Sequence, residues 1–469
     1  MAGIASLAFH FPVYSIRAES YAEMWGTFRA PGVEEKTVAG YDEDEVTLAV
    51  EAVKGLPLPD DVGYLATATF GGPRLSTTVA VALGMEEARK GDFAGSTNAS
   101  GEALMACLDY VEASGEPAVL VAADVPQAAP NDPTEHRLGS AAAALLLTSE
   151  GGLQVEETAT HTQEEYGEAF VDSNGRRRSI EGTGFARQVV QTGAPDVLKG
   201  LGTGRVAMHE PDGRWAYRVL KGVVSLKQIG GGVVRRSGDT GCVSPLLALT
   251  EVVHGARKGS RLGLVTYGGG STVAFALRVA SKPAGVASPS EALAADRWYL
   301  DYPTYARYRR FLTGRDPAGE VSQGAYVSLP TYLDSVDARY RLMAARCRAC
   351  DRVDFPPRPV CLDCGGHDFV QEPLSGKGEV YARTIIARGS SPTEFHEQQD
   401  IIGSYAVALV QTREGPRIVT QLTDVDPATV EIGMPVDAVL RRIYRQEGVV
   451  RYGYKFRPRT PRPAAIETA

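Results

Sequence analysis

Four cysteines in two C-x-x-C pairs are the residues of this chain whose spacing specifies a chemistry most directly. They are Cys347, Cys350, Cys361 and Cys364, and ten residues separate the two pairs. Zn²⁺ binds four thiolates in a tetrahedron, and each C-x-x-C turn directs two sulfurs at one metal. Because four thiolates leave no ligand position for a substrate, we predict a structural zinc site. Two disulfides or four free thiols are the alternatives, whereas a redox motif calls for a single C-x-x-C at the start of a helix.

Three polar residues stand where strand-like and helical segments meet in the first 280 residues. Thr97 precedes the helical pattern 99–114, His209 ends a strand-like run, and Asp239 lies in a Gly-bounded turn before another helical pattern. A helix N-terminus offers backbone N–H groups to negative charge, and histidine transfers protons near neutral pH. We therefore take all three as candidate site residues, although His209 could equally be a core histidine and Asp239 an ordinary turn residue that caps the next helix.

The elements that must position these residues alternate between two patterns. The strand-like runs are 3–9, 62–70, 117–125, 141–147, 204–209, 261–268 and 272–279. The helical runs are 43–56, 75–85, 99–114, 178–201 and 244–259. This alternation predicts an α/β domain with a mixed or parallel sheet.

The pattern changes after residue 280. Short strands with turns every few residues follow the last cysteine pair, which predicts a small barrel or sandwich. We expect an α/β domain at 1–280, a linker with helices at 281–340, a zinc ribbon at 341–372, a β-rich domain at 373–462 and a tail at 463–469.

Two basic segments leave alternatives open. Residues 175–179, with three consecutive arginines, are expected to form a solvated loop, although they could hold phosphates of a carrier. The aromatic and basic stretch from Trp298 to Arg310 either lines a coenzyme A channel or packs the linker helix.

Bulk composition excludes several classes of protein. Hydrophobic residues make up 43% and charged residues 23% of the chain, the net charge is -8 and the pI is about 5.6. An acidic surface argues against nucleic acid or an anionic membrane as the main partner. No apolar stretch approaches the 18 residues of a membrane span, and the N-terminus has the pattern of a first strand. Six cysteines, four of them in a metal pattern, fit a reducing cytoplasm.

The first 280 residues resemble the thiolase superfamily, and most of all its branch of ketoacyl-ACP synthase III and hydroxymethylglutaryl-CoA synthase. Three features carry the resemblance: His209 with Arg214 five residues later, the turn SGDTGCVSP with Asp239 thirty residues after His209, and the glycine-rich segment 267–277. The resemblance implies a layered αβαβα core, a homodimer, and an acyl thioester carried by CoA or phosphopantetheine. It also implies an oxyanion and cofactor site at Gly269 and Gly270, with Arg214 binding the carrier. On this resemblance we expect His209 to act as a base or oxyanion donor, with Asp239 orienting it or shuttling its proton.

This chain departs from that family at its reactive positions. Without gaps, the nucleophilic cysteine is replaced by Thr97, with Ser96 beside it. The family's asparagine becomes Asp239, and Ala68 stands where a hydroxymethylglutaryl-CoA synthase carries its general-acid glutamate. Acyl transfer through a cysteine thioester is therefore not expected.

A second resemblance covers residues 290 to 462. An aromatic, Arg-rich helix, the cysteine pairs with prolines between them, and a β-rich segment ending GYKFRP look like the zinc-ribbon/OB-fold acyl-CoA-associated family. This resemblance implies a rubredoxin-like ribbon followed by an OB-fold barrel. Members of that family often accompany thiolase-fold partners as a separate chain.

Together these features predict an enzyme that makes or breaks a C–C bond next to an acyl thioester without a cysteine nucleophile, by aldol, retro-aldol or Claisen-like chemistry. An acyl carrier protein is a further candidate partner. One alternative is an acyltransferase that uses Ser96, Thr97 or Ser100 as its nucleophile. The other is a non-catalytic scaffold whose pocket binds acyl chains.

Overall fold

The computed structural model describes residues 2–164, 169–179, 183–200, 204–230, 232–284, 286–295, 297–312, 328–446 and 449–459. The chain divides into two compact units. One consists of Met1–Ala39, Asp44–Val81 and Met85–Tyr305, and the other of Gly40–Glu43, Ala82–Gly84 and Ala306–Ala469. In the described part of the chain, no helix has both the length and the apolar character needed to cross a bilayer. The predicted tail at 463–469 lies outside the described residues.

A nine-stranded mixed sheet forms the centre of the N-terminal unit, with the strand order β11-β12-β13-β8-β1-β7-β6-β4-β5. The strands are β1 (Gly3–His10), β4 (Tyr64–Thr69), β5 (Arg89–Ala94), β6 (Ala118–Asp124), β7 (Ala141–Thr148), β8 (Leu153–Thr162), β11 (Arg205–Met208), β12 (Arg261–Gly268) and β13 (Ser271–Val279). The pairs β4/β5, β4/β6 and β11/β12 are parallel and the others are antiparallel. The predicted α/β class is thus confirmed.

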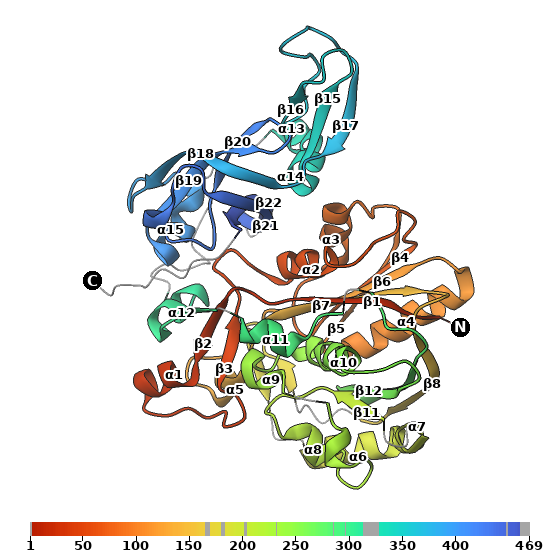
Figure 1. Ribbon diagram of the computed structural model, residues 1–469. Coiled ribbons are helices and arrows are strands. Elements are labelled where there is room, and N and C mark those ends of the chain that lie inside the picture. The colour runs from red at the N-terminus through yellow and green to blue at the C-terminus, as the bar shows by residue number, and fades with distance from the viewer. Residues whose placement is uncertain are drawn as a thin grey trace. The chain divides into compact units, whose positions relative to one another are not determined.

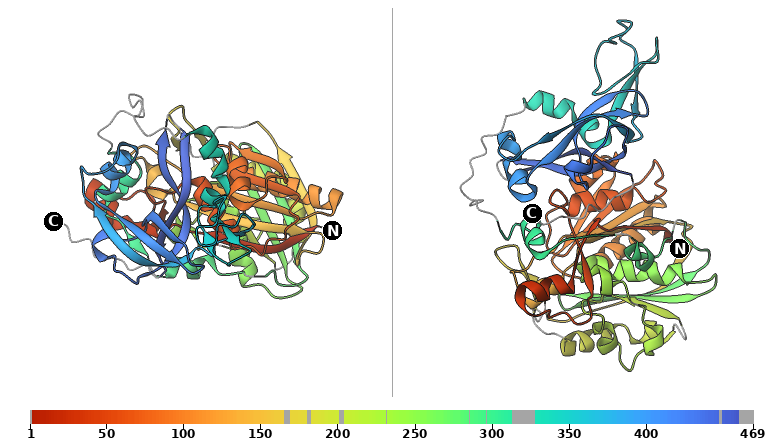
Figure 2. Two further views of the ribbon diagram at one scale, coloured as in Figure 1. Left: turned by 90° about the horizontal axis from the view of Figure 1, so that it is seen from above. Right: turned by 60° about the vertical axis from the view of Figure 1, so that its left-hand side comes forward.

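The sheet consists of two halves, because β1 and β8 pair only through Gly3↔Gln154 and Ile4↔Leu153. Helices α4 (Ala99–Ser114) and α10 (Ser244–His254) contact strands of both halves. Helix α2 (Glu45–Val53) packs on β1, β6 and β7, and α6 (Thr183–Gly193) on β8 and β13. The result is the predicted αβαβα layering (Figures 1 and 2).

Close packing between the layers depends on small residues in α4. A Cβ at Gly101 would lie 1.9 Å from the hydroxyl of Thr266 on β12. Only glycine therefore lets the helix approach that strand. This approach places the N-terminus of α4 at the end of β12, where the candidate nucleophile position lies.

The predicted helix at 178–201 is wrong at its start. Strands β9 (Ala169–Val171) and β10 (Arg177–Ser179) form a hairpin there, and α6 begins only at Thr183. The helix is also divided, because α7 (Pro195–Gly200) starts anew at Pro195, which has no N–H to continue the preceding turns.

The C-terminal unit contains a three-stranded ribbon and a five-stranded barrel. The ribbon is formed by β15 (Met343–Cys347), β16 (Val353–Asp354) and β17 (Phe369–Pro373), and Figures 1 and 2 show it projecting beyond one end of the barrel. The barrel strands are β18 (Lys377–Ile386), β19 (Tyr405–Thr412), β20 (Arg417–Gln421), β21 (Pro435–Gln446) and β22 (Val449–Pro458), in the order β20-β19-β18-β21-β22. A bridge between Leu422 and Phe456 brings the end of β20 to β22 and nearly closes the sheet, as an OB fold requires.

Candidate active site and metal centre

His209 and Asp239 meet in the interior of the N-terminal unit. His209 directly follows β11, and its Nε2 lies 3.2 Å from Oδ1 of Asp239. The Asp239 backbone is fixed by a bridge to Leu138, in which its N–H donates to the carbonyl of Arg137. Both side chains are buried, His209 with 5% of its surface exposed and Asp239 with none. The structure thus brings together the two residues that the sequence paired.

Two arginines determine the charge of Asp239. Nη2 of Arg177 lies 3.1 Å from Oδ2, and Nε of Arg137 lies 4.0 Å from it. Burial alone would raise the pKa of the Asp239 carboxyl, but Arg177 and the hydrogen bond from His209 lower it well below its usual value. Oδ1 also accepts the N–H of Gly241 at 3.0 Å. Asp239 is therefore an ionised acceptor.

The charge of Asp239 fixes the tautomer of His209. A carboxylate only accepts hydrogen bonds, so the nitrogen facing it, Nε2, carries the proton. In the neutral ring, Nδ1 then carries the lone pair. Among the described residues, buried Nδ1 has no hydrogen-bond partner. The arrangement suits a general base whose second nitrogen is held by a carboxylate.

Arg177 differs from its predicted place in a solvated loop. Its side chain is 3% exposed and its guanidinium lies 4.4 Å from the centre of the Phe70 ring. Side chains alternate along β10, so Arg178 points outward to Asp132 and Asp172 while Arg177 points inward. Each strand of this hairpin is only three residues long, so the sequence shows no alternation of polar and apolar residues that would predict it.

Asp124 is a second buried carboxylate that the sequence analysis missed. It ends β6 and accepts hydrogen bonds from the Thr69 hydroxyl at 2.9 Å, the Phe70 N–H at 2.7 Å and the Cys242 N–H at 2.8 Å. Burial raises its pKa. An aspartate directly after a continuous apolar strand is the signal that would have marked it, since such strand ends carry chemistry in α/β folds.

Neither cysteine of the N-terminal unit is an activated thiol. Burial, followed by the adjacent Asp124 carboxylate, raises the pKa of Cys242 well above its usual value. Burial likewise raises the pKa of Cys107, which lies in the core. Both remain thiols at neutral pH, and thiols are poor nucleophiles.

The three hydroxyls near the start of α4 are held differently from a catalytic nucleophile. The Thr97 hydroxyl donates to the Tyr267 carbonyl at 2.5 Å, and Ser96 Oγ accepts the N–H of Asn98 at 3.1 Å. Ser100 is buried, and its hydroxyl has no hydrogen-bond partner in the part of the chain that the structure describes. Within the described ranges, no hydrogen bond joins these hydroxyls to a histidine or a carboxylate.

The glycine-rich turn lies beside Ser96. Gly269 (φ +60°) and Gly270 (φ +72°) both have left-handed backbones, and a Cβ at Gly269 would be 3.2 Å from the Cβ of Ser96. A Cβ at Gly270 would be 2.6 Å from the carbonyl oxygen of Gln163. Glycine is therefore required at both positions.

Aromatic rings connect this turn to His209, whereas Arg214 stands apart. The rings of His209 and Trp215 are 5.6 Å apart between centroids, and those of Trp215 and Tyr267 are 5.8 Å apart. Arg214 is exposed at the start of α8 (Trp215–Val219), and its backbone N–H donates to Asp212. Its guanidinium is not brought to the His209–Asp239 pair.

The four ribbon cysteines converge on one point. All four sulfurs lie within 4.8 Å of one another, with 3.6 Å between Cys347 and Cys364 and 3.5 Å between Cys350 and Cys361. A tetrahedral ion with Zn–S bonds of about 2.3 Å needs sulfurs about 3.8 Å apart, so this set fits zinc. His367 Nδ1 instead contacts the carbonyl of Pro359 at 3.1 Å.

Comparisons with known proteins agree with both parts of the fold. Family models match residues 336–370 (ChsH2, rubredoxin-like zinc ribbon domain) and 371–441 (ChsH2, C-terminal OB-fold domain). A hydroxymethylglutaryl-CoA synthase of Pyrobaculum neutrophilum is 28% identical over 66% of this chain and 97% of its own length. A crystal structure of HMG-CoA synthase complexed with CoA superimposes with a TM-score of 0.61 at 17% identity, over 70% of this chain and 95% of the other. The structure of a 3-oxoacyl-(acyl carrier protein) synthase III of Pseudomonas aeruginosa superimposes with a TM-score of 0.53 at 18% identity, over 60% of this chain and 98% of the other.

The fold therefore defines a hydroxymethylglutaryl-CoA synthase-like thiolase unit fused to a zinc ribbon and an OB fold. A DUF35 domain-containing scaffold protein of Pyrococcus furiosus is 39% identical over 26% of this chain and 85% of its own length. The chain belongs to the DUF35 domain-containing scaffold protein family through this C-terminal part.

Proposed function

We propose that the N-terminal unit makes or breaks a C–C bond next to an acyl thioester, with His209 as general base and without an acyl-cysteine intermediate. The observation that carries the proposal is the contact between His209 Nε2 and an ionised Asp239. A carboxylate at this position cannot donate to an oxyanion as an amide would, but it can orient an imidazole for proton transfer. Aldol, retro-aldol and Claisen-like reactions all require such a transfer.

The remaining roles follow from the surroundings of the pair. Backbone N–H groups near Thr97 and the turn at Gly269 and Gly270 are the proposed donors to an enolate oxygen. Ala68, buried in β4, offers no acid. Arg214 is exposed and would bind carrier phosphates.

The substrate carrier, metal and assembly are part of this proposal. Among the similar structures, an HMG-CoA synthase is complexed with CoA and a curacin HMG synthase with a donor acyl carrier protein, which supports a CoA or phosphopantetheine thioester. The four-sulfur cluster supports a structural zinc. The edge strand β5 leaves backbone groups on one side for a second copy, which supports a homodimer. We further propose a cytoplasmic location.

The proposal is tested by α-proton exchange. The protein is incubated in D₂O with a panel of acyl-CoA thioesters, and mass spectrometry follows deuterium entering the α-carbon. Wild type is expected to exchange above background, and His209→Gln is expected not to. His254→Gln, which changes a histidine at the end of α10, is the matched control and should exchange like wild type. Intact-mass analysis of the same samples should show no acyl adduct, and a stable adduct would contradict the mechanism.

A second candidate is an acyltransferase with an oxygen nucleophile. It is favoured by the partly exposed Ser96 next to the Gly269 turn. Peptide mapping of an acylated Ser96, Thr97 or Ser100 would support it. A third candidate is an acyl-binding scaffold, which is favoured by the similarity to DUF35 scaffold proteins. It predicts that neither His209→Gln nor Asp239→Asn affects function.

A further inference from the structure

The C-terminal unit contains a half-open cavity of about 40 Å³ that includes none of the residues around His209 and Asp239. Every residue lining it belongs to that unit. The lining comes from the segment Gly40–Glu43, from Arg310 after α12 (Tyr302–Tyr308), from the turn Thr393–Phe395 with the following α15 (His396–Ile402), and from β21 and β22.

A β-bulge in β21 directs an unusual number of side chains toward this cavity. In a regular strand, successive side chains point to opposite faces. Here four consecutive residues, 442–445, line the cavity. The pairing with β22 shifts register between Arg442 and Tyr444, so Ile443 is an extra residue. Bulges of this kind re-aim side chains and are common next to binding sites.

Three arginines, Arg310, Arg442 and Arg445, line the cavity together with three carboxylates, Asp42, Glu394 and Glu397. Asp42 is paired with Lys455 at 2.9 Å and Glu397 with Arg310 at 2.7 Å, and Glu394 accepts a hydrogen bond from the Thr393 hydroxyl at 3.4 Å. Burial, and then the neighbouring Arg442, lower the pKa of Arg310 to about 9 although Glu397 opposes this.

Two buried donors of the lining have no acceptor among the described residues. Nε of Arg310 is one. The other is Nε2 of Gln398, a residue only 8% exposed. Gln398 cannot turn to satisfy it, because its Oε1 accepts from Lys455 at 3.0 Å. Unpaired buried N–H groups cost free energy and call for an acceptor.

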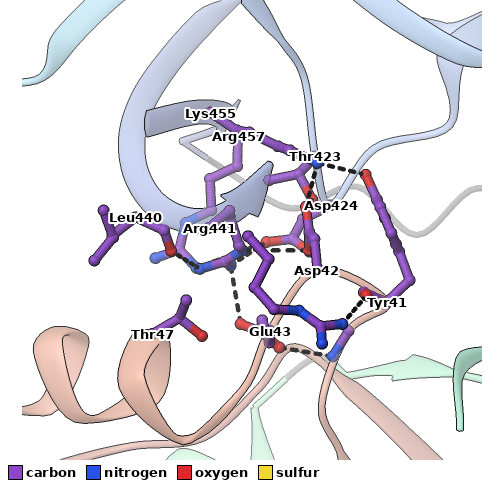
Figure 3. Close-up of polar contacts among 12 residues, drawn as sticks. Tyr41, Asp42, Glu43, Thr47, Thr423, Asp424, Leu440, Arg441, Lys455 and Arg457 are labelled. Atoms are coloured by element: carbon purple, nitrogen blue, oxygen red, sulfur yellow. Dashed lines mark hydrogen bonds and ion pairs between the residues drawn. The ribbon is translucent and has the colours of Figure 1, made fainter. Parts of the chain in front are cut away.

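A buried ionic network, whose members Arg441, Asp424 and Lys455 are labelled in Figure 3, holds one of these two donors. Arg441 Nη2 lies 2.9 Å from both Glu43 and Asp424, and Lys455 connects Asp42 to Gln398. The Gln398 amide is thus held in place before any ligand enters, which lowers the entropic cost of binding.

We propose that this cavity binds the phosphate groups of a small ligand, a diphosphate or a nucleotide, through Arg310, Arg445 and the amide of Gln398. Arginine guanidinium groups suit phosphate because they offer several N–H donors in one plane. Two rings of the lining, Tyr41 and Tyr444, provide apolar surface for a base if the ligand is a nucleotide.

The test is isothermal titration calorimetry of the full-length, zinc-loaded protein with inorganic pyrophosphate and, separately, with ADP. Wild type is expected to bind at least one of them. Arg445→Glu, at an exposed position, is expected to weaken binding about tenfold or more. Arg413→Glu makes the same charge change in the β19–β20 turn, outside the cavity, and should bind like wild type. Arg310→Gln should resemble Arg445→Glu if its melting curve matches wild type.

This test is independent of the proposed reaction in the thiolase-like unit, because His209→Gln should bind both probes like wild type. Tighter binding of ADP than of pyrophosphate identifies a nucleotide, and equal or weaker binding of ADP identifies the diphosphate group alone. Absence of binding for both probes, or equal weakening by Arg413→Glu and Arg445→Glu, overturns the proposal.

Discussion

His209 donates its Nε2 proton to an aspartate, Asp239, at 3.2 Å, in a place where the related synthases were expected to have an amide. An amide in this position can donate a hydrogen bond to an oxyanion, whereas an ionised carboxylate can only accept. Under the proposed function, this carboxylate orients the imidazole for proton transfer, whereas an amide would serve an oxyanion.

Replacing Asp239 by asparagine separates these two kinds of chemistry. If the carboxylate orients His209 as base, D239N should lower α-proton exchange by about 100-fold or more, the usual range for general acid–base catalysis. It should also destabilise the fold, because buried Arg177 loses its partner. Removing one member of a buried pair costs about 3–5 kcal/mol. Activity at or above wild type, in a folded variant, would show that an amide serves the reaction better and would contradict the base assignment.

Arg177→Gln tests what holds Asp239 ionised. The folded-state pKa of Asp239 is depressed, so its contribution to stability is present above the unfolded value of about 3.9 and is lost as the pH falls. R177Q should remove that contribution. The difference in melting temperature between wild type and R177Q should therefore be large at pH 7 and should shrink below about pH 4.

Arg178→Gln is the matched control for this experiment. Its guanidinium is 40% exposed and pairs with Asp132 and Asp172, so its loss should cost less than about 1 kcal/mol. Any loss of zinc at low pH affects all three proteins alike. If the difference in melting temperature between wild type and R177Q stays constant from pH 7 to pH 3, the arginine acts through packing on Phe70 and not through charge.

The sequence predicted those elements whose periodicity is strong and local. Strand 261–268 and helix 99–114 agree with β12 and α4 to the residue. Strand β8 was missed because its Thr, His and Glu side chains alternate along a half-exposed face and resemble a loop. The pairing of His209 with Asp239 was predictable only through a family resemblance. Arg177 was not, since a three-residue strand has no measurable period.

Long-range contacts set the limit of prediction in the C-terminal unit as well. The Arg442 guanidinium donates to the carbonyl of Tyr41, 401 residues away. Nothing near either residue indicates this contact, because the chain crosses the entire thiolase-like unit between them. The zinc site, in contrast, could be predicted, because the spacing of its cysteine ligands is a local feature of the sequence.

Thiol chemistry provides a further prediction. In the native, zinc-loaded protein, we expect no cysteine to react with a thiol reagent such as DTNB. Cys107 and Cys242 are buried with raised pKa values, and the other four cysteines are expected to bind zinc. All six cysteines should react after denaturation with a chelator. C242A should retain α-proton exchange. Rapid labelling of Cys242 in the folded protein would instead indicate an accessible, activated thiol.

Zinc content tests the ribbon directly. Metal analysis should give about one zinc per chain, and Cys350→Ser should lower it and unfold the ribbon, because small ribbons depend on the metal for folding. His367→Ala should keep the zinc, since its ring contacts Pro359. Loss of zinc from H367A would place the histidine among the ligands.

The buried ionic network makes the final prediction, which concerns the stability of the C-terminal unit. Arg441 is completely buried among Asp42, Glu43 and Asp424, and R441M would leave three carboxylates with Lys455 as their main counter-charge. We expect a loss of about 3–5 kcal/mol, seen as a lower urea midpoint. R459M is the matched control, because the Arg459–Asp437 pair is solvent-exposed and should contribute less than about 1 kcal/mol. Equal midpoints for R441M and wild type would mean that the three carboxylates take up protons when the arginine is removed, and a pH titration of R441M would then show its stability falling as the pH rises.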